Sequence, residues 1–172
     1  EELVRYVYAK GHRRIAFIHG EQTAVTENRL TGFYRACDAL ELEIPDAYIR
    51  EGVYHDPDRC AELTRELLRL PEPPTCILMP DDFSSIGGRN AIHRMDLRLP
   101  EDISAAGYDG IQIASVMSPA LTTYRQDTQA LGRTAAAKLI ELIEKPRTAL
   151  VDRVLIPGHL VEGASVRAIE TL

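Results

Sequence analysis

The chain has 172 residues, of which 45% are hydrophobic, and its formal net charge is −6. This hydrophobic content can supply a folded core, while the acidic balance and the scattered lysines and arginines exclude a DNA-binding surface on this part of the protein. The sequence shows neither an export signal nor an apolar run long enough to cross a membrane. We therefore expect a cytoplasmic protein that does not bind membranes.

The three cysteines, Cys37, Cys60 and Cys76, lie far apart and show no CxxC spacing. Each occupies a position in an apolar pattern. We expect buried free thiols, not a disulfide or a metal site.

The first part of the chain begins inside an amphipathic helix with no capping residue before Glu1, so we expect the protein to continue upstream. A short apolar strand follows at residues 14–19. Thr26 is then placed to cap a second helix, whose apolar side chains recur every three or four residues: Leu30, Phe33, Cys37 and Leu40.

The middle of the chain repeats this alternation. A strand is predicted at residues 48–53, and Asp56 and Pro57 then open a helix that ends before the proline-rich stretch at 71–75. A strand at 76–79, a helix at 82–95 and a strand at 102–109 follow. Short strands that alternate with helices are typical of βαβ units, so we predict an α/β fold with a parallel sheet between two helical layers.

The last third has a different pattern. Residues 119–127 are extended and rich in β-branched side chains, and a long helix then ends at Pro146. Its apolar positions are Leu131, Ala135, Leu139, Leu142 and Ile143. Residues 152–166 alternate apolar and polar side chains, as in a half-exposed strand or hairpin.

Most enzymatic motifs are absent. The sequence contains no phosphate-binding P-loop, dinucleotide-binding glycine motif, hydrolase nucleophile elbow or zinc-protease HExxH motif. The five histidines are scattered, and none pairs with a cysteine or an aspartate at the spacing of metal ligands. We expect no catalytic residue, no metal and no cofactor, and hence a protein that is not an enzyme.

Polar residues instead follow the predicted strands where each strand ends. In a parallel α/β sheet, ligands bind beyond the carboxyl ends of the strands. Arg29, Tyr54, Asp81 and Asp109 would meet there and suit a small hydroxyl-bearing molecule, since carboxylates accept from hydroxyls and a guanidinium donates to them. Tyr54 could equally lie at the edge of the core, and Asp109 could simply form a turn.

Asp81 and Asp82 lie side by side at the end of a strand. We expect Asp82 to cap the following helix by accepting from the amides of Ser84 or Ser85, and Asp81 to face the cleft. The alternative is a metal-dependent phosphoryl-transfer or receiver-like enzyme that uses both carboxylates. A receiver would need an acidic pair after the first strand and a lysine after a late one, and the sequence has neither.

Five stretches together resemble one protein family: "GHRRIAFIHG", "NRLTGFYRA", "PTCILMPDDFSSIGG", "LRLPEDISAAGYDG" and "SPALTTYRQDTQALGRTAAAKLIELI". They are similar to the effector-sensing core of the LacI/GalR family of bacterial transcription regulators. The similarity runs from about residue 3 to residue 161.

The resemblance implies the periplasmic-binding-protein type I fold, in which two α/β subdomains enclose an effector. Residues 1–125 would form the C-terminal effector-binding subdomain. Residues 126–150 would form a crossover and a helix of the otherwise missing N-terminal subdomain, and residues 151–172 would return as strand and tail. The resemblance further implies a homodimer that binds DNA only through an absent N-terminal helix-turn-helix. The helix after residue 126 would then bury its apolar face on this subdomain or on a second copy.

The resemblance also carries site residues over to this chain. The implied effector contacts are Arg29, Tyr54, Asp81, Asp109 and Gln126, and the implied effector is a carbohydrate or a derivative of one. Asp81 adds an anion beside Asp109, which favours a polyhydroxylated or amine-bearing effector. Asp96 stands where the family commonly has glycine, so we expect a left-handed backbone there. A free-standing sugar-binding protein is a further alternative.

Overall fold

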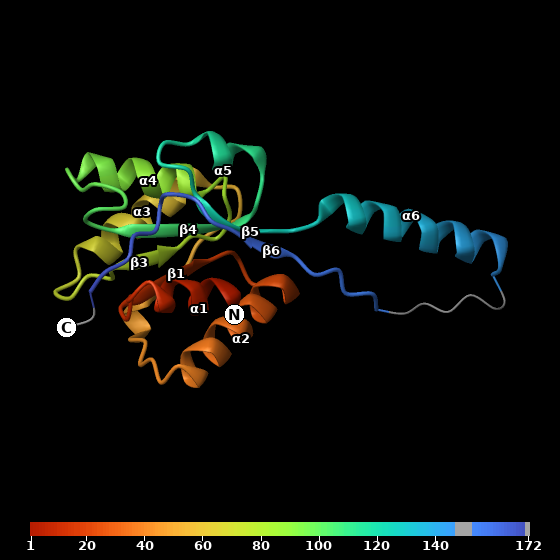
Figure 1. The fold of residues 1–172 in the computed structure, drawn as a ribbon, viewed down its shortest axis with the longest axis horizontal. Helices are drawn as coiled ribbons and strands as arrows, with labels where there is room; N and C mark the ends of the chain where they lie inside the picture. Colours follow the sequence, from red (N-terminus) through yellow and green to blue (C-terminus); the bar gives the residue numbers. More distant parts are fainter. Residues whose placement is uncertain (147–152, 171–172) are drawn as a thin grey trace.

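The structure is a computed structural model, and it describes residues 1–146 and 153–170. One sheet lies between two layers of helices, as predicted (Figure 1). The helices are α1 Glu2–Ala9, α2 Ala24–Ala39, α3 Pro57–Leu68, α4 Ser85–Arg94, α5 Gln112–Val116 and α6 Thr128–Glu144, with a short 3₁₀ helix η1 at Asp46–Tyr48. The strands are β1 Ile15–His19, β2 Ile49–Glu51, β3 Cys76–Leu78, β4 Ser104–Asp109, β5 Thr122–Arg125 and β6 His159–Val161.

The strands form a six-stranded sheet in the order β2-β1-β3-β4-β5-β6. The first five strands run parallel to their neighbours, and β6 pairs with β5 in the antiparallel direction. The chain leaves β1, β2, β3, β4 and β5 at the same edge of the sheet. The segments that follow these strands therefore converge, which is what positions the candidate site.

Each face of the sheet has its own core. Successive side chains of a strand point to opposite faces. Ile15 and Phe17 of β1 accordingly pack in the cluster under α1 and α2, whereas Ala16 and Ile18 pack in the cluster under α3 and α4. Both faces of β1 are covered by helices, which explains its uninterrupted apolar sequence.

Several predicted boundaries differ from the structure. The strand predicted at 48–53 is only β2 Ile49–Glu51, and the helix predicted from residue 82 begins at Ser85. Within the predicted 152–166 segment, β6 occupies three residues and the flanking described residues form no strand. The expected return of the chain near residue 151 lies outside the described residues. Asp96 has a φ of 58°, so the predicted left-handed turn is confirmed.

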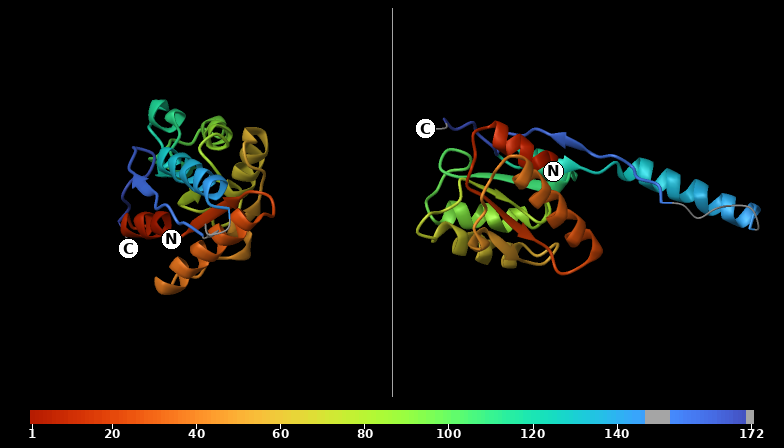
Figure 2. Two further views of the ribbon diagram at one scale, coloured as in Figure 1. Left: turned by 90° about the vertical axis from the view of Figure 1, so that its right-hand side faces the viewer. Right: turned by 90° about the horizontal axis from the view of Figure 1, so that it is seen from below.

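Helix α6 projects away from the rest of the molecule (Figures 1 and 2). It contains no buried residue, and large apolar side chains are exposed along it: Leu131, Leu139, Ile140 and Ile143. The helix therefore does not bury its apolar face on the rest of this chain, so the predicted burial within the chain is wrong. Burial against a second copy stays a prediction.

The three cysteines are free and buried, as predicted. Burial raises the pKa of the Cys60 thiol to about 12. Across residues 1–146 and 153–170, no helix combines the length and the apolar character that a membrane crossing requires.

Candidate functional site

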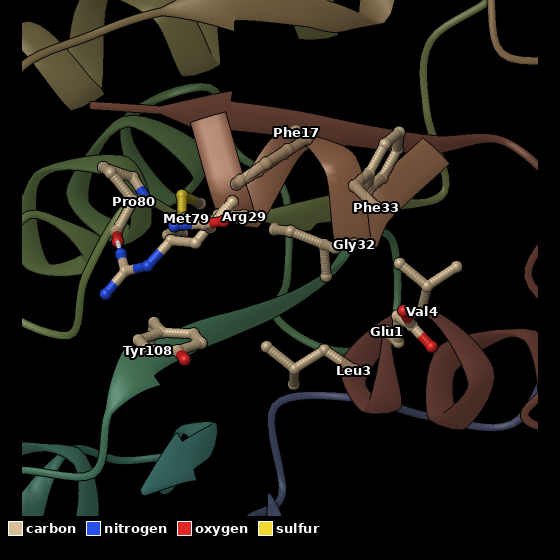
Figure 3. Close-up of a pocket in the computed structure, with 12 residues that line it drawn as sticks. Glu1, Leu3, Val4, Phe17, Arg29, Gly32, Phe33, Met79, Pro80 and Tyr108 are labelled. Carbon is tan, nitrogen blue, oxygen red and sulfur yellow. Dashed lines mark hydrogen bonds between the residues drawn. The ribbon is translucent and has the colours of Figure 1, made fainter. Parts of the chain in front are cut away.

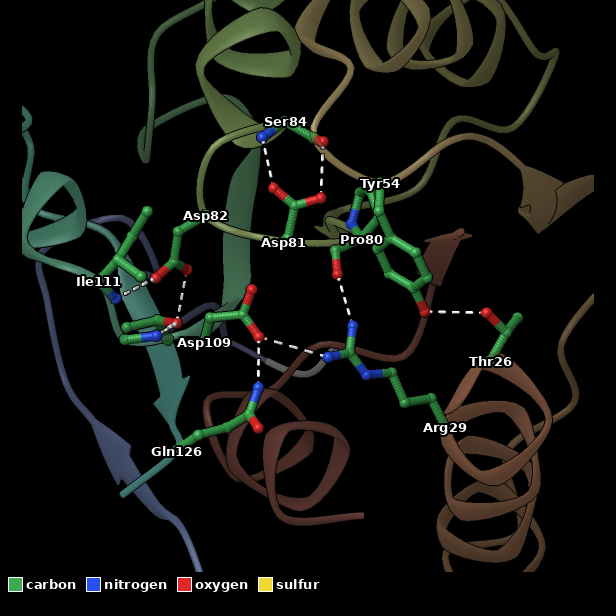
Figure 4. Close-up of polar contacts among 12 residues, drawn as sticks. Thr26, Arg29, Tyr54, Pro80, Asp81, Asp82, Ser84, Asp109, Ile111 and Gln126 are labelled. Atoms are coloured by element: carbon green, nitrogen blue, oxygen red, sulfur yellow. Dashed lines mark hydrogen bonds and ion pairs between the residues drawn. The ribbon is translucent and has the colours of Figure 1, made fainter. Parts of the chain in front are cut away.

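Four of the five predicted contact residues lie together at the carboxyl edge of the sheet (Figure 4). With Pro80 and Tyr108, which both contact Arg29, they form a polar rim. Helix α2 supplies one of the four predicted residues, the loop after β2 supplies the second, the last residue of β4 is the third, and the segment after β5 supplies the fourth. In order they are Arg29, Tyr54, Asp109 and Gln126.

Arg29 is the centre of this rim. Its guanidinium donates a 2.8 Å hydrogen bond to the carbonyl of Pro80 and forms a 3.4 Å ion pair with Asp109. The same group stacks 3.7 Å from the ring centroid of Tyr108 and lies 5.2 Å from that of Tyr54. The Arg29 side chain is only 15% exposed. Such a fixed, planar cation presents its remaining N–H groups in one direction.

Asp109 connects the rim to the segment that leaves the sheet. Its carboxylate accepts a 2.6 Å hydrogen bond from the side-chain amide of Gln126, and its backbone carbonyl accepts from the Gln126 amide. Burial raises the pKa of the Asp109 carboxyl, and the neighbouring Arg29 opposes this shift. The residue has a φ of 108°, a conformation rare outside glycine, so the turn holds Asp109 in a strained backbone.

Tyr54 lies at the outer side of the rim. Its hydroxyl shares a 2.9 Å hydrogen bond with that of Thr26, and its backbone amide donates to Glu21. The ring packs directly on Gly20, where a Cβ atom would lie 2.2 Å from it. Tyr54 is thus an ordered, half-buried aromatic face at the rim rather than part of either core cluster.

Neither of the two adjacent aspartates lies where the sequence predicted. Asp81 was expected to face the cleft, but it is 1% exposed, and its two oxygens accept from the amide and hydroxyl of Ser84 and from the amide of His55. This carboxylate therefore stabilises the turn before α4, which is the role predicted for Asp82. These three hydrogen-bond donors explain how a buried carboxylate without an ion-pair partner is tolerated there.

Asp82 does not cap α4, so that prediction is wrong. Its carboxylate accepts a 2.6 Å hydrogen bond from the hydroxyl of Thr123 and a 2.9 Å bond from the amide of Ile111. The turn after β3 directs this fully buried side chain across β4 instead of back toward its own helix. Burial raises the pKa of Asp82 to about 6.

This geometry gives no support to an acidic pair that holds a metal or transfers a phosphoryl group. The carboxylates of Asp81 and Asp82 point to different neighbours and do not share a space. Among the residues that the structure describes, no group of three or more histidine, cysteine, aspartate or glutamate side chains could hold a metal ion.

Tyr108 is a rim residue that the sequence prediction missed. It precedes Asp109 in β4, so strand alternation turns it to the face covered by α1 and α2, and Arg29 reaches it from α2. Its position beside the predicted Asp109, together with that alternation, was the signal that could have identified it.

The sequence and the fold match those of known proteins. Residues 4–166 match the model of the periplasmic binding protein-like domain family. The HTH-type transcriptional repressor PurR of Escherichia coli O139:H28 is 33% identical over 168 residues, which cover 95% of this chain and 49% of PurR. The chain thus spans about half the length of the curated relatives that it matches.

Solved structures agree with this relationship. The complex of the transcriptional regulator CelR with cellobiose has a TM-score of 0.86 at 29% identity, over 94% of this chain and 49% of CelR. The Lac repressor dimer bound to operator and the anti-inducer ONPF has a TM-score of 0.85 at 28% identity, over 96% of this chain and 49% of the repressor chain. The chain belongs to the periplasmic binding protein-like domain family and is homologous to the repressors of the LacI family.

Proposed function

We propose that this chain is the C-terminal half of the effector-sensing domain of a LacI-family transcriptional regulator. The observation that carries the proposal is the rim centred on Arg29, where a fixed guanidinium, a partly buried carboxylate and an aromatic face converge. Side chains of this kind bind hydroxyl groups and pack against sugar rings.

The effector is a carbohydrate or a carbohydrate derivative. Asp109 and Gln126 accept and donate hydrogen bonds at the rim, and Arg29 is already partly neutralised by Asp109. Asp109 would repel an anionic effector, and its pairing with Arg29 reduces the attraction of that cation, so a neutral or amine-bearing molecule fits better. The binding of cellobiose by the related CelR supports a sugar.

The segment after β5 is where this half meets the other half of the domain. Residues 1–125 form one subdomain, residues 126–150 cross to the other subdomain and supply a helix to it, and residues 151–172 return. The exposure of the apolar side chains of α6 supports this division, because such a face needs a protein partner. Gln126 bonds Asp109 at the crossing point, so effector contact and subdomain orientation share a residue.

The whole regulator is a cytoplasmic homodimer that binds DNA through an N-terminal helix-turn-helix. An effector with different affinities for two subdomain orientations would change the affinity for the operator. The relationship to PurR, an HTH-type repressor, and to a Lac repressor dimer bound to operator supports this proposal.

The test is operator release by the full-length protein. Its DNA would be identified by selection from random duplexes, and a panel of mono- and disaccharides, amino sugars and sugar acids would be added to the complex. We expect a neutral or amine-bearing sugar to change operator affinity about 5- to 150-fold. Failure of the protein to select any DNA sequence, or a response confined to sugar acids, would contradict the proposal.

A further inference from the structure

A pocket of about 220 Å³ lies behind the rim, between α1, α2 and the sheet (Figure 3). Its wall is mainly apolar and includes five buried side chains: Val4, Phe17, Phe33, Leu78 and Met79. Phe17 and Phe33 stack with their ring centroids 5.2 Å apart and form an aromatic wall. A pocket of this composition favours an apolar guest.

The pocket lies at the same end of the sheet as the rim. Pro80 follows β3, and Tyr108 lies near the end of β4, and both line the pocket. Arg29 also lines it, while the same guanidinium pairs with Asp109 on the rim. A molecule held at Asp109 could therefore extend past Arg29 into the pocket without leaving the protein surface.

Helix α2 has a glycine where it passes the start of α1. Gly32 lines the pocket, and a Cβ atom built there would make only ordinary contacts, at 3.5 Å, with Glu1. A side chain at this position would occupy the pocket without first displacing backbone atoms. The size also fits a guest, since an engineered apolar cavity of about 150 Å³ binds benzene.

We propose that this pocket receives an apolar substituent of the effector, an aromatic ring or a branched alkyl group. The inference rests on the proposed sensing function and extends it. The effector class becomes a glycoside whose sugar bonds Arg29 and Asp109 and whose aglycone packs against Phe17 and Phe33. Aromatic guests suit this wall because offset-stacked and edge-to-face ring pairs are favourable.

The first experiment needs no sugar. Fluorobenzene is titrated into the 172-residue chain and followed by fluorine NMR, and the pocket predicts saturable binding. Gly32→Ala, Gly32→Val and Gly32→Leu should weaken binding in that order, by about tenfold or more for leucine. Gly132→Leu is the matched control, because Gly132 in α6 has nothing within 4 Å of a built Cβ atom, and it should leave the affinity unchanged.

Circular dichroism of each variant separates filling of the pocket from unfolding, and the alanine and valine variants keep the series informative if the leucine variant does not fold. If fluorobenzene shows no saturable binding, or binds with equal affinity to all the Gly32 variants, the proposed binding pocket is refuted. Loss of fluorobenzene binding in the full-length protein would also overturn it, because another part of the protein would then fill the space.

The second experiment compares phenyl and methyl glycosides of the same sugars on the full-length protein. For a sugar that binds, the phenyl glycoside should bind about tenfold or more tightly than the methyl glycoside, and Gly32→Leu should abolish the difference. Equal affinities would refute the aglycone role. If the protein binds fluorobenzene but no glycoside, the sugar effector is refuted. If it binds glycosides but not fluorobenzene, only the pocket is refuted.

Discussion

The hydroxyl of Thr123 donates a 2.6 Å hydrogen bond to the buried carboxylate of Asp82 and so joins the turn after β3 to β5. The other Asp82 oxygen accepts from the amide of Ile111, in the loop that follows Asp109. Asp82 therefore fixes the position of the loop that follows Asp109, although it does not itself reach the rim.

Asp82→Asn and Asp82→Ala should separate the hydrogen bonds of this side chain from its charge. The folded pKa, about 6, exceeds the ordinary value of 3.8, so the folded protein binds the proton more tightly than the unfolded chain. Its contribution to stability is therefore present below about pH 4 and is lost as the pH rises through about 6. Asp82→Asn should remove this pH-dependent decrease in the free energy of unfolding, as measured by urea unfolding at several pH values.

An asparagine can still accept from Ile111 and donate to Thr123, so Asp82→Asn should be about as stable as the natural protein near pH 4 and more stable than it at pH 7. Asp82→Ala leaves both partners unsatisfied and should lower the free energy of unfolding by roughly 2–4 kcal/mol. An alanine variant that matches the natural protein at pH 7 would contradict the assigned hydrogen bonds.

His12 should make the protein sensitive to acid. It is 1% exposed and bonds the hydroxyl of Thr75 and the carbonyl of Arg167, so it links the start of β1 to the C-terminal segment. Burial lowers its pKa below the ordinary 6.5. As the pH falls, His12 therefore takes up its proton in the unfolded chain before it does so in the folded protein. The neutral His12 contributes stability above about pH 6.5, and this contribution is lost as the pH falls through the pKa of the folded protein.

His12→Gln should reduce this acid sensitivity relative to the natural protein, as measured by unfolding in urea between about pH 5 and pH 7. His93→Gln is the control, because His93 is exposed. The windows of His12 and Asp82 overlap with opposite signs, so each variant must be compared with the natural protein at every pH. An unchanged profile in His12→Gln would rule out this assignment.

Gly87 should be intolerant of any side chain. A Cβ atom there would lie 1.6 Å from the carbonyl oxygen of Pro57, so α3 and α4 could no longer pack at their present distance. Gly87→Ala should cost about 3 kcal/mol or more, as measured by chemical unfolding. Gly32→Ala is the matched helical control and should gain about 0.5–1 kcal/mol, since it relieves the entropy cost of glycine without a clash. Equal effects at the two positions would refute the close packing.

The exposed face of α6 should drive self-association of the 172-residue chain. Leu139 and Ile143 are 59% and 70% exposed, and burial of such side chains is favourable. Leu139→Lys with Ile143→Lys should yield a monomer in sedimentation velocity experiments. Thr134→Lys with Ala137→Lys adds the same charge on the opposite face of α6, and this control should self-associate as the natural chain does. A natural chain that sediments as a monomer at high concentration would count against this expectation.

The layered fold could be predicted because its signals are local. Strand residues such as Ile15 and Phe17 are apolar without interruption, and the helices between the strands have regular apolar spacing. The same reasoning identified Arg29 and Asp109, since the ends of parallel strands meet at one edge. These positions follow from the topology and not from details of side-chain packing.

The roles of Asp81 and Asp82 could not be predicted in the same way. Both follow the same strand, and the choice of which one bonds Ser84 depends on the backbone direction of a three-residue turn. The partner of Asp82, Thr123, lies 41 residues away in the chain, so no local pattern indicates it. Long-range hydrogen bonds of this kind decide the site and become visible only in three dimensions.

Calorimetric titration of the full-length protein with the sugar that changes operator affinity tests most directly whether the rim binds the effector. Arg29→Lys loses the planar fork and the stacking on Tyr108, so it should weaken binding by about tenfold or more. Arg50 of β2 forms a partly exposed ion pair with Glu66 of α3, and the control variant Arg50→Lys should bind as the natural protein does. Equal affinity of Arg29→Lys and the natural protein would contradict an effector site centred on Arg29.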